Sequence, residues 1–72
     1  MSVVKVITLV GQSPDSFARA AEAAINEASR TIRNIKSFQV DQLSGEVADG
    51  KITNYRASVQ IAFVGDRNDG SV

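Results

Sequence analysis

One long alternating segment, from Ile52 to Val64, constrains the fold more than any other feature of the sequence. Apolar or aromatic side chains occupy most of one set of alternate positions, and polar side chains occupy most of the other set. A period of two over so long a segment is typical of a β-strand with one buried and one wetted face. The rest of the chain must therefore supply cover for the apolar face of this strand.

The Asp49-Gly50 pair predicts a tight hairpin between this strand and a preceding strand over residues 37–47. A two-residue turn here pairs Ala48 with Lys51 and so fixes the register. The expected cross-strand pairs are Phe38–Ile61, Val40–Val59, Gln39–Gln60, Asp41–Ser58 and Leu43–Arg56. These pairs sort the apolar side chains onto one face and the polar ones onto the other. Gly45 is a candidate for a bulge, which would shift the register near Arg56.

A strand and a helix are expected before the hairpin. Residues 3–10 are rich in Val and Ile, which predicts a strand, and Gly11-Gln12 is expected to end it. Ser13-Pro14-Asp15 suits the start of a helix, with Ser13 as the cap, and the helix is expected to stop near Arg33. Its apolar stripe consists of Phe17, Ala20, Ala21, Ala24, Ile25, Ala28 and Ile32. Because most of the stripe is Ala, the helix can lie unusually close to its sheet.

The element order is therefore β-α-β-β, in the α+β class. A helical crossover makes the first two strands parallel, and the hairpin makes the third antiparallel to the second. With the third strand in the middle, a three-stranded antiparallel sheet wraps around one long helix. We expect residues 1–64 to form one domain and residues 65–72, which are polar and turn-rich, to form a flexible C-terminal tail.

The composition limits both the chemistry and the stability of the chain. It has 72 residues, 43% of them hydrophobic, and contains neither Cys nor His. Disulfides, thiolate nucleophiles, Cys or His metal sites and Ser-His-Asp triads are therefore excluded, and we do not expect an enzyme. A chain this short buries only about 60% of its unfolded surface. Since small folds without cross-links usually associate, we expect a homo-oligomer.

The charge pattern argues against two classes of partner. The net charge is zero and the basic residues are scattered, so we expect no nucleic-acid partner. The longest apolar run, residues 6–10, is far too short to cross a bilayer, so we expect no membrane partner. The N-terminal segment lacks a signal-peptide pattern, and we expect a cytoplasmic protein.

The polar face of the predicted sheet is the first candidate for a functional surface. Its expected members are Ser37, Gln39, Asp41, Asn54, Arg56, Ser58 and Gln60. Antiparallel sheets commonly have one face exposed to solvent, and this surface can be such a face. The alternative is a hydrated subunit interface or a ligand cleft.

Three further patterns give only weak signals. The carboxylates of Asp41 and Glu46 are expected to be solvated rather than catalytic. The segment 66–70 faintly resembles a calcium loop, but its spacing is wrong and it lacks the terminal Glu. The segment 11–14 fits a helix cap better than a phosphate site, because Pro14 removes an N–H donor.

Several stretches of the chain resemble those of the dodecin family in their order and lengths. They are residues 3–17 around Gly11-Gln12-Ser13-Pro14, the Ala-rich helix, Asn34-Ile35-Lys36-Ser37-Phe38-Gln39-Val40, and residues 50–63 from Gly50-Lys51-Ile52 through Tyr55-Arg56. The resemblance covers about residues 3–64 and implies a β-α-β-β protein that assembles into a hollow homododecamer. It also implies non-enzymatic binding and storage of flavin (riboflavin, FMN or FAD) between subunits. The flavin-binding positions that it implies are Ser37, Phe38, Gln39, Glu46 and Arg56.

The sequence departs from the pattern of flavin-binding dodecins. Those proteins usually have a Trp, which stacks on the flavin, where this chain has Ser37, and a Gln where it has Arg56. They often have Arg-Gly-His where this chain has Ser44-Gly45-Glu46. Loss of aromatic stacking costs about 1–3 kcal/mol, or roughly tenfold or more in affinity. The alternative is a flavin-free shell with a structural role or a role in binding a divalent cation, because some dodecin-like proteins lack the Trp and one binds calcium.

Overall fold

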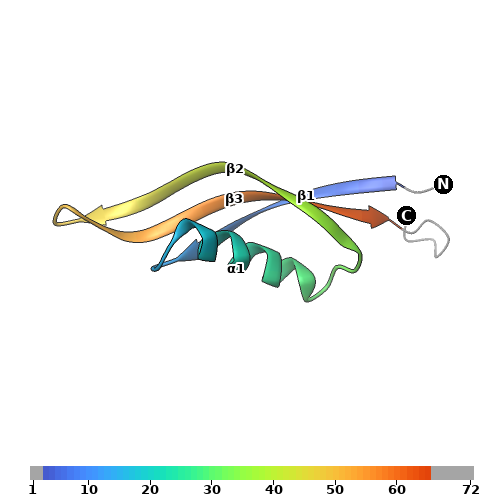
Figure 1. Ribbon diagram of the computed structural model, residues 1–72, viewed down its shortest axis with the longest axis horizontal. Coiled ribbons are helices and arrows are strands. Elements are labelled where there is room, and N and C mark those ends of the chain that lie inside the picture. The colour runs from blue at the N-terminus through green and yellow to red at the C-terminus, as the bar shows by residue number, and fades with distance from the viewer. Residues whose placement is uncertain (1–2, 66–72) are drawn as a thin grey trace.

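The structure is a computed structural model that describes residues 3–65. Its elements are β1 (Val3–Ser13), α1 (Phe17–Ser29), β2 (Ile35–Ala48) and β3 (Lys51–Gly65). The strands form one sheet in the order β1-β3-β2, with β3 antiparallel to both neighbours. The predicted β-α-β-β order with the third strand in the middle is confirmed. The β2–β3 hairpin extends beyond the helix, so that the molecule measures 53 × 19 × 14 Å (Figure 1).

The core is a thin layer between α1 and the middle of the sheet. Its buried members are Ala20, Ala21, Ala24, Ala28, Ala57, Val59 and Ile61. The predicted Ala stripe is confirmed, with Ile25 and Ile32 packed at its margin. The helix lies on β1 and β3 and hardly touches β2. The helix-facing side of β2 is therefore left largely uncovered.

Gly11 does not end the first strand, and this prediction was wrong. β1 continues through Gly11 and Gln12 to Ser13. A Cβ atom on Gly11 would lie 1.9 Å from the backbone oxygen of Ala20 in the helix. The glycine therefore allows the helix to approach the strand closely, which is one reason for a glycine inside a strand.

The helix is shorter than predicted at both ends. Its N-cap is Ser16, whose Oγ accepts a hydrogen bond from the backbone N–H of Arg19. Ser13, the predicted cap, instead accepts from the N–H of Asp15 at 2.9 Å within the preceding turn. The helix ends at Ser29 instead of Arg33, and Asn34, with φ 62°, takes the left-handed conformation as the chain turns into β2.

The predicted hairpin turn is confirmed. Asp49 and Gly50 both have positive φ, 53° and 76°, as a type I′ turn requires. Ala48 pairs with Lys51 across the turn. The predicted pairs Phe38–Ile61, Val40–Val59 and Gln39–Gln60 are present.

The register in the middle of the hairpin differs from the prediction. Three irregularities lie between β2 and β3, and two of them bound the middle of the hairpin, one leaving Thr53 unpaired on β3 and one leaving Asp41 unpaired on β2. Between them the pairing moves by one residue, and the observed pairs are Gln42–Ser58, Leu43–Ala57, Ser44–Arg56 and Gly45–Tyr55. The predicted pairs Asp41–Ser58 and Leu43–Arg56 are therefore wrong. The distal pairs are unaffected because the second bulge cancels the first.

The C-terminal boundary is also different from the predicted one. Gly65, placed by the prediction in the tail, is the last residue of β3 and pairs with Val3. The rest of the predicted tail, residues 66–72, lies outside the described residues. Within the described part of the chain, the only helix is too short to span a membrane.

Candidate functional site

The face of the sheet that points away from α1, here called the outer face, carries polar side chains from all three strands. The register places Gln12 beside Arg56 and Thr8 beside Gln60 on the β1 side. On the β2 side it places Ser44 beside Arg56 and Gln39 beside Gln60. The outer face is therefore a wide polar surface in which β3 forms the middle row.

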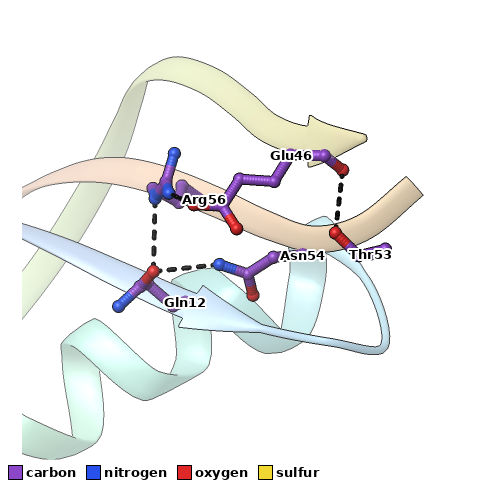
Figure 2. Close-up of polar contacts among 5 residues, drawn as sticks. All are labelled: Gln12, Glu46, Thr53, Asn54 and Arg56. Atoms are coloured by element: carbon purple, nitrogen blue, oxygen red, sulfur yellow. Dashed lines mark hydrogen bonds and ion pairs between the residues drawn. The ribbon is translucent and has the colours of Figure 1, made fainter. Parts of the chain in front are cut away.

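Four residues on this face form the Arg56 network, which consists of Gln12, Glu46, Asn54 and Arg56 (Figure 2). Nη2 of Arg56 forms an ion pair with the carboxylate of Glu46, and Nε of Arg56 donates to Oε1 of Gln12 at 3.2 Å. The same Gln12 oxygen accepts from Nδ2 of Asn54 at 2.9 Å. The guanidinium is thus held from both neighbouring strands.

Thr53, the residue left unpaired on β3, is tied back to β2. Its Oγ1 donates to the backbone oxygen of Glu46 at 3.3 Å (Figure 2). This contact closes the bulge directly beside Glu46. The bulge therefore helps to set the position from which Glu46 reaches Arg56.

A hollow of about 150 Å³ lies farther along the same face, and we call it the outer pocket. Its lining consists of Val6, Ser37, Phe38, Gln39, Gln60 and Ala62. All six lining residues are uncharged. Val6 and Ala62 supply apolar surface and the two Gln amides supply donors and acceptors. This combination suits a flat ligand with an apolar ring and polar edges.

The structure separates the five predicted site residues into two groups. Ser37, Phe38 and Gln39 line the outer pocket, whereas Glu46 and Arg56 belong to the Arg56 network. Ser37 pairs with Ala62, which lies six residues beyond Arg56 on β3, a separation of about 20 Å along a strand. One chain therefore does not bring the two groups into contact.

Sequence reasoning missed Gln12 and Val6 as parts of this surface. Gln12 was overlooked because Gly11-Gln12 was expected to end the strand, although the alternation of β1 continues through it. Val6 was not among the expected members of the polar face, but it is exposed and lines the outer pocket. Once the strand is known to continue to Ser13, its two-residue period places Val6 and Gln12 on the same face.

A second hollow, the helix–β2 groove, lies on the opposite side of the sheet. It has a volume of about 500 Å³ and is lined by Phe17, Ala18, Ala21, Glu22, Ile25, Phe38, Val40 and Leu43. Phe38 and Leu43 remain 53% and 52% exposed. Phe17 closes one end by an edge-to-face contact with Tyr55, at 4.9 Å between ring centroids. The groove is an apolar surface that the chain itself leaves open.

The acidic residues of the outer face already have partners. Asp41 accepts a hydrogen bond from Nε2 of Gln60 at 3.2 Å, and Glu46 is paired with Arg56. Among residues 3–65, no group of three Asp, Glu, His or Cys side chains is arranged to hold a metal ion. The segment 66–70, which faintly resembles a calcium loop, lies outside the described residues.

Comparison with known proteins identifies the family. A family model described as Dodecin matches residues 3–66. The chain belongs to the dodecin family. It is similar to a curated dodecin from Thermus thermophilus, with 28% identity over 61 residues that cover 85% of this chain and 88% of that protein. It is also similar to a calcium dodecin from Mycobacterium tuberculosis, with 38% identity over 64 residues that cover 88% and 89% of the two chains.

Solved dodecin structures share the fold of this dodecin. A structure of dodecin from Streptomyces coelicolor superposes with a TM-score of 0.88 at 29% identity, covering 92% of this chain and 94% of that one. The crystal structure of the calcium dodecin from Mycobacterium tuberculosis gives a TM-score of 0.77 at 32% identity, covering 90% and 93%. That structure is described as having a novel calcium-binding site.

Proposed function

We propose that this dodecin is a non-enzymatic flavin-binding and storage protein that works as a homododecamer. The observation that carries the proposal is the outer pocket, where Ser37 and Gln39 meet Gln60 and Val6 on one polar sheet face. Apolar surface flanked by amides suits an isoalloxazine ring, which is flat and carries donors and acceptors at its edge. The pocket is shallow, so a ligand there needs a second surface to cover its other face.

The proposed self-association would supply that cover. The helix–β2 groove leaves Phe38 and Leu43 about half exposed, and Val4, Val6 and Val10 are exposed on the outer face. Apolar surface on both sides of a 72-residue chain favours burial against further copies.

Ser37 is expected to make flavin binding weak. A serine side chain offers no ring face on which the flavin can stack, and base–aromatic stacking contributes about 1–3 kcal/mol per base. We therefore expect measurable but modest affinity for riboflavin in the natural sequence. Restoration of an aromatic side chain at this position should strengthen binding.

Titration of the protein with riboflavin, followed by quenching of flavin fluorescence, tests the proposal. We expect quenching by the natural protein and a Kd about tenfold lower or better for Ser37→Trp, from the stacking contribution. Ser44→Trp is the matched control, because Ser44 lies on the same strand and face but beside Arg56. If neither the natural protein nor Ser37→Trp quenches riboflavin, the flavin proposal is wrong.

The similarity to a calcium dodecin supports a second candidate function, a flavin-free shell that binds a divalent cation. Asp41 and Glu46 would then contribute carboxylates to a site shared between subunits, since one chain gathers too few ligands among residues 3–65. Calorimetric titration with CaCl2 tests this candidate. Heat of binding that disappears in Asp41→Asn would support it, and no heat at millimolar calcium would exclude it.

A further inference from the structure

We infer that the Glu46–Arg56 pair makes the outer face selective for uncharged flavins over their phosphate esters. Glu46 would thus determine specificity without providing a contact to the ring. This inference rests on the proposed flavin-binding function. It concerns the part of the ligand that extends from the outer pocket toward the hairpin.

The first step concerns the position of Arg56 relative to the outer pocket. Gln60 lines the pocket, and Arg56 lies four residues away on the same strand and the same face, a distance of about 13 Å along β3. Within residues 54–65 of β3, Arg56 is the only Lys or Arg. A phosphate on the side chain of a ring-bound flavin that extends along β3 would therefore approach this arginine.

The second step concerns the hydrogen-bonding capacity of that arginine. Its Nη2 is paired with Glu46 and its Nε donates to Gln12, whose oxygen is also held by Asn54 (Figure 2). The side chain of Arg56 is 32% exposed, so its partners partly cover it. A phosphate would have to displace or share the carboxylate of Glu46 to obtain a bidentate contact with the guanidinium.

The third step concerns the charge along this path. Asp41 contacts Gln60 at the edge of the outer pocket, so two carboxylates, Asp41 and Glu46, accompany one guanidinium. The net charge of these three side chains is −1. A phosphate ester carries about −1.5 to −2 charges at neutral pH. It is therefore repelled by this part of the face, whereas the hydroxyl of riboflavin is not.

Riboflavin and FMN differ only by that phosphate, so parallel fluorescence titrations test the inference. For the natural protein at low ionic strength, we expect riboflavin to bind about threefold to tenfold more tightly than FMN. This ratio of affinities should fall as the salt concentration rises. Glu46→Gln should release Arg56 and raise FMN affinity relative to riboflavin by a similar factor. Glu27→Gln is the matched control, because it breaks an exposed ion pair with Arg30 on the helix and should leave the ratio unchanged.

The same titrations in a Ser37→Trp background separate failure of this inference from failure of the proposed function. If only the Ser37→Trp proteins bind flavin, the selectivity is measured in that background. FMN binding equal to or tighter than riboflavin binding, or a Glu46→Gln change that lowers the relative affinity for FMN, would overturn the inference while flavin binding stands. Absence of riboflavin binding in every protein would overturn both.

Discussion

At the scale of single residues, the close approach of α1 to β1 depends on an absent side chain. Gly11 lies under the helix, and a Cβ there would come within 1.9 Å of the Ala20 oxygen and 2.9 Å of the Ala24 nitrogen. Both neighbours are backbone atoms of a helix and cannot rotate away. A glycine inside a Val-rich segment resembles a strand break in the sequence, and only the position of the helix reveals its role.

Gly11→Ala should therefore destabilise the protein by about 1–3 kcal/mol or more, because the helix must move off the sheet. Urea denaturation at one fixed protomer concentration measures this change. Gly50→Asn is the control, since Gly50 has positive φ with open space around it, and Asn tolerates that conformation. A cost for Gly11→Ala no larger than that of the control would contradict the packing argument.

At the scale of secondary-structure elements, alternation and turn chemistry made most of the fold predictable. The period of two located β3, Asp49-Gly50 located the hairpin, and the Ala stripe located the buried face of α1. The sequence indicated a bulge at Gly45, but Gly45 pairs with Tyr55, and the register between residues 42 and 46 comes from two one-residue bulges that cancel and leave the pairs on either side unchanged. Sequence alternation alone does not show an insertion that is compensated farther along the same hairpin.

The start of the helix was misplaced because two serines, Ser13 and Ser16, lie in the polar segment before it. Ser16 caps α1 through its contact with the N–H of Arg19 at 3.0 Å, whereas Ser13 stabilises the turn before it. Both contacts are local side chain-to-backbone hydrogen bonds, which Ser makes readily at caps and turns alike. The apolar stripe that begins with Phe17 is the better guide, because the cap directly precedes it.

Ser16→Ala should cost about 1 kcal/mol of stability, the usual contribution of a serine N-cap. Thermal unfolding followed by circular dichroism at a fixed protomer concentration measures the loss. Ser29→Ala serves as the control, because Ser29 lies at the other end of α1 and only donates to the Ile25 carbonyl. Equal costs for the two variants would contradict the assignment of Ser16 as the cap.

At the scale of the whole molecule, one helix is too narrow for a three-stranded sheet. α1 covers β1 and β3, and the hairpin continues past it with Val47 69% and Ile52 55% exposed (Figure 1). The sequence predicted this shortage of cover from chain length and composition. It could not predict that the open surface would be a groove between α1 and β2, because that depends on where the helix lies across the sheet.

The candidate site was predictable in location but not in organisation. The alternation placed Ser37, Gln39 and Arg56 on one wet face, and the register supports this placement. The separation of about 20 Å between Ser37 and Arg56 follows from the same register. Nothing in the sequence indicated that Gln12 and Asn54 would hold Arg56, since the contact with Gln12 joins residues 44 positions apart in the chain.

Leu43→Lys should dissociate the proposed assembly. Leu43 lines the helix–β2 groove, and a buried ammonium there would oppose close packing of a second copy. In an isolated chain the same lysine would reach solvent and change stability by only about 0.5 kcal/mol. Size-exclusion chromatography with light scattering measures the mass, with Asn26→Lys on the exposed side of α1 as the control for charge.

Sedimentation velocity of the natural protein at micromolar protomer concentration tests the central claim, that identical copies cover what one helix cannot. We expect one species of about 92 kDa, twelve times the 7.7 kDa chain, and no appreciable free chain. A single species of 7.7 kDa whose core amides resist hydrogen exchange would contradict the account, because it would show that the lone chain needs no further cover.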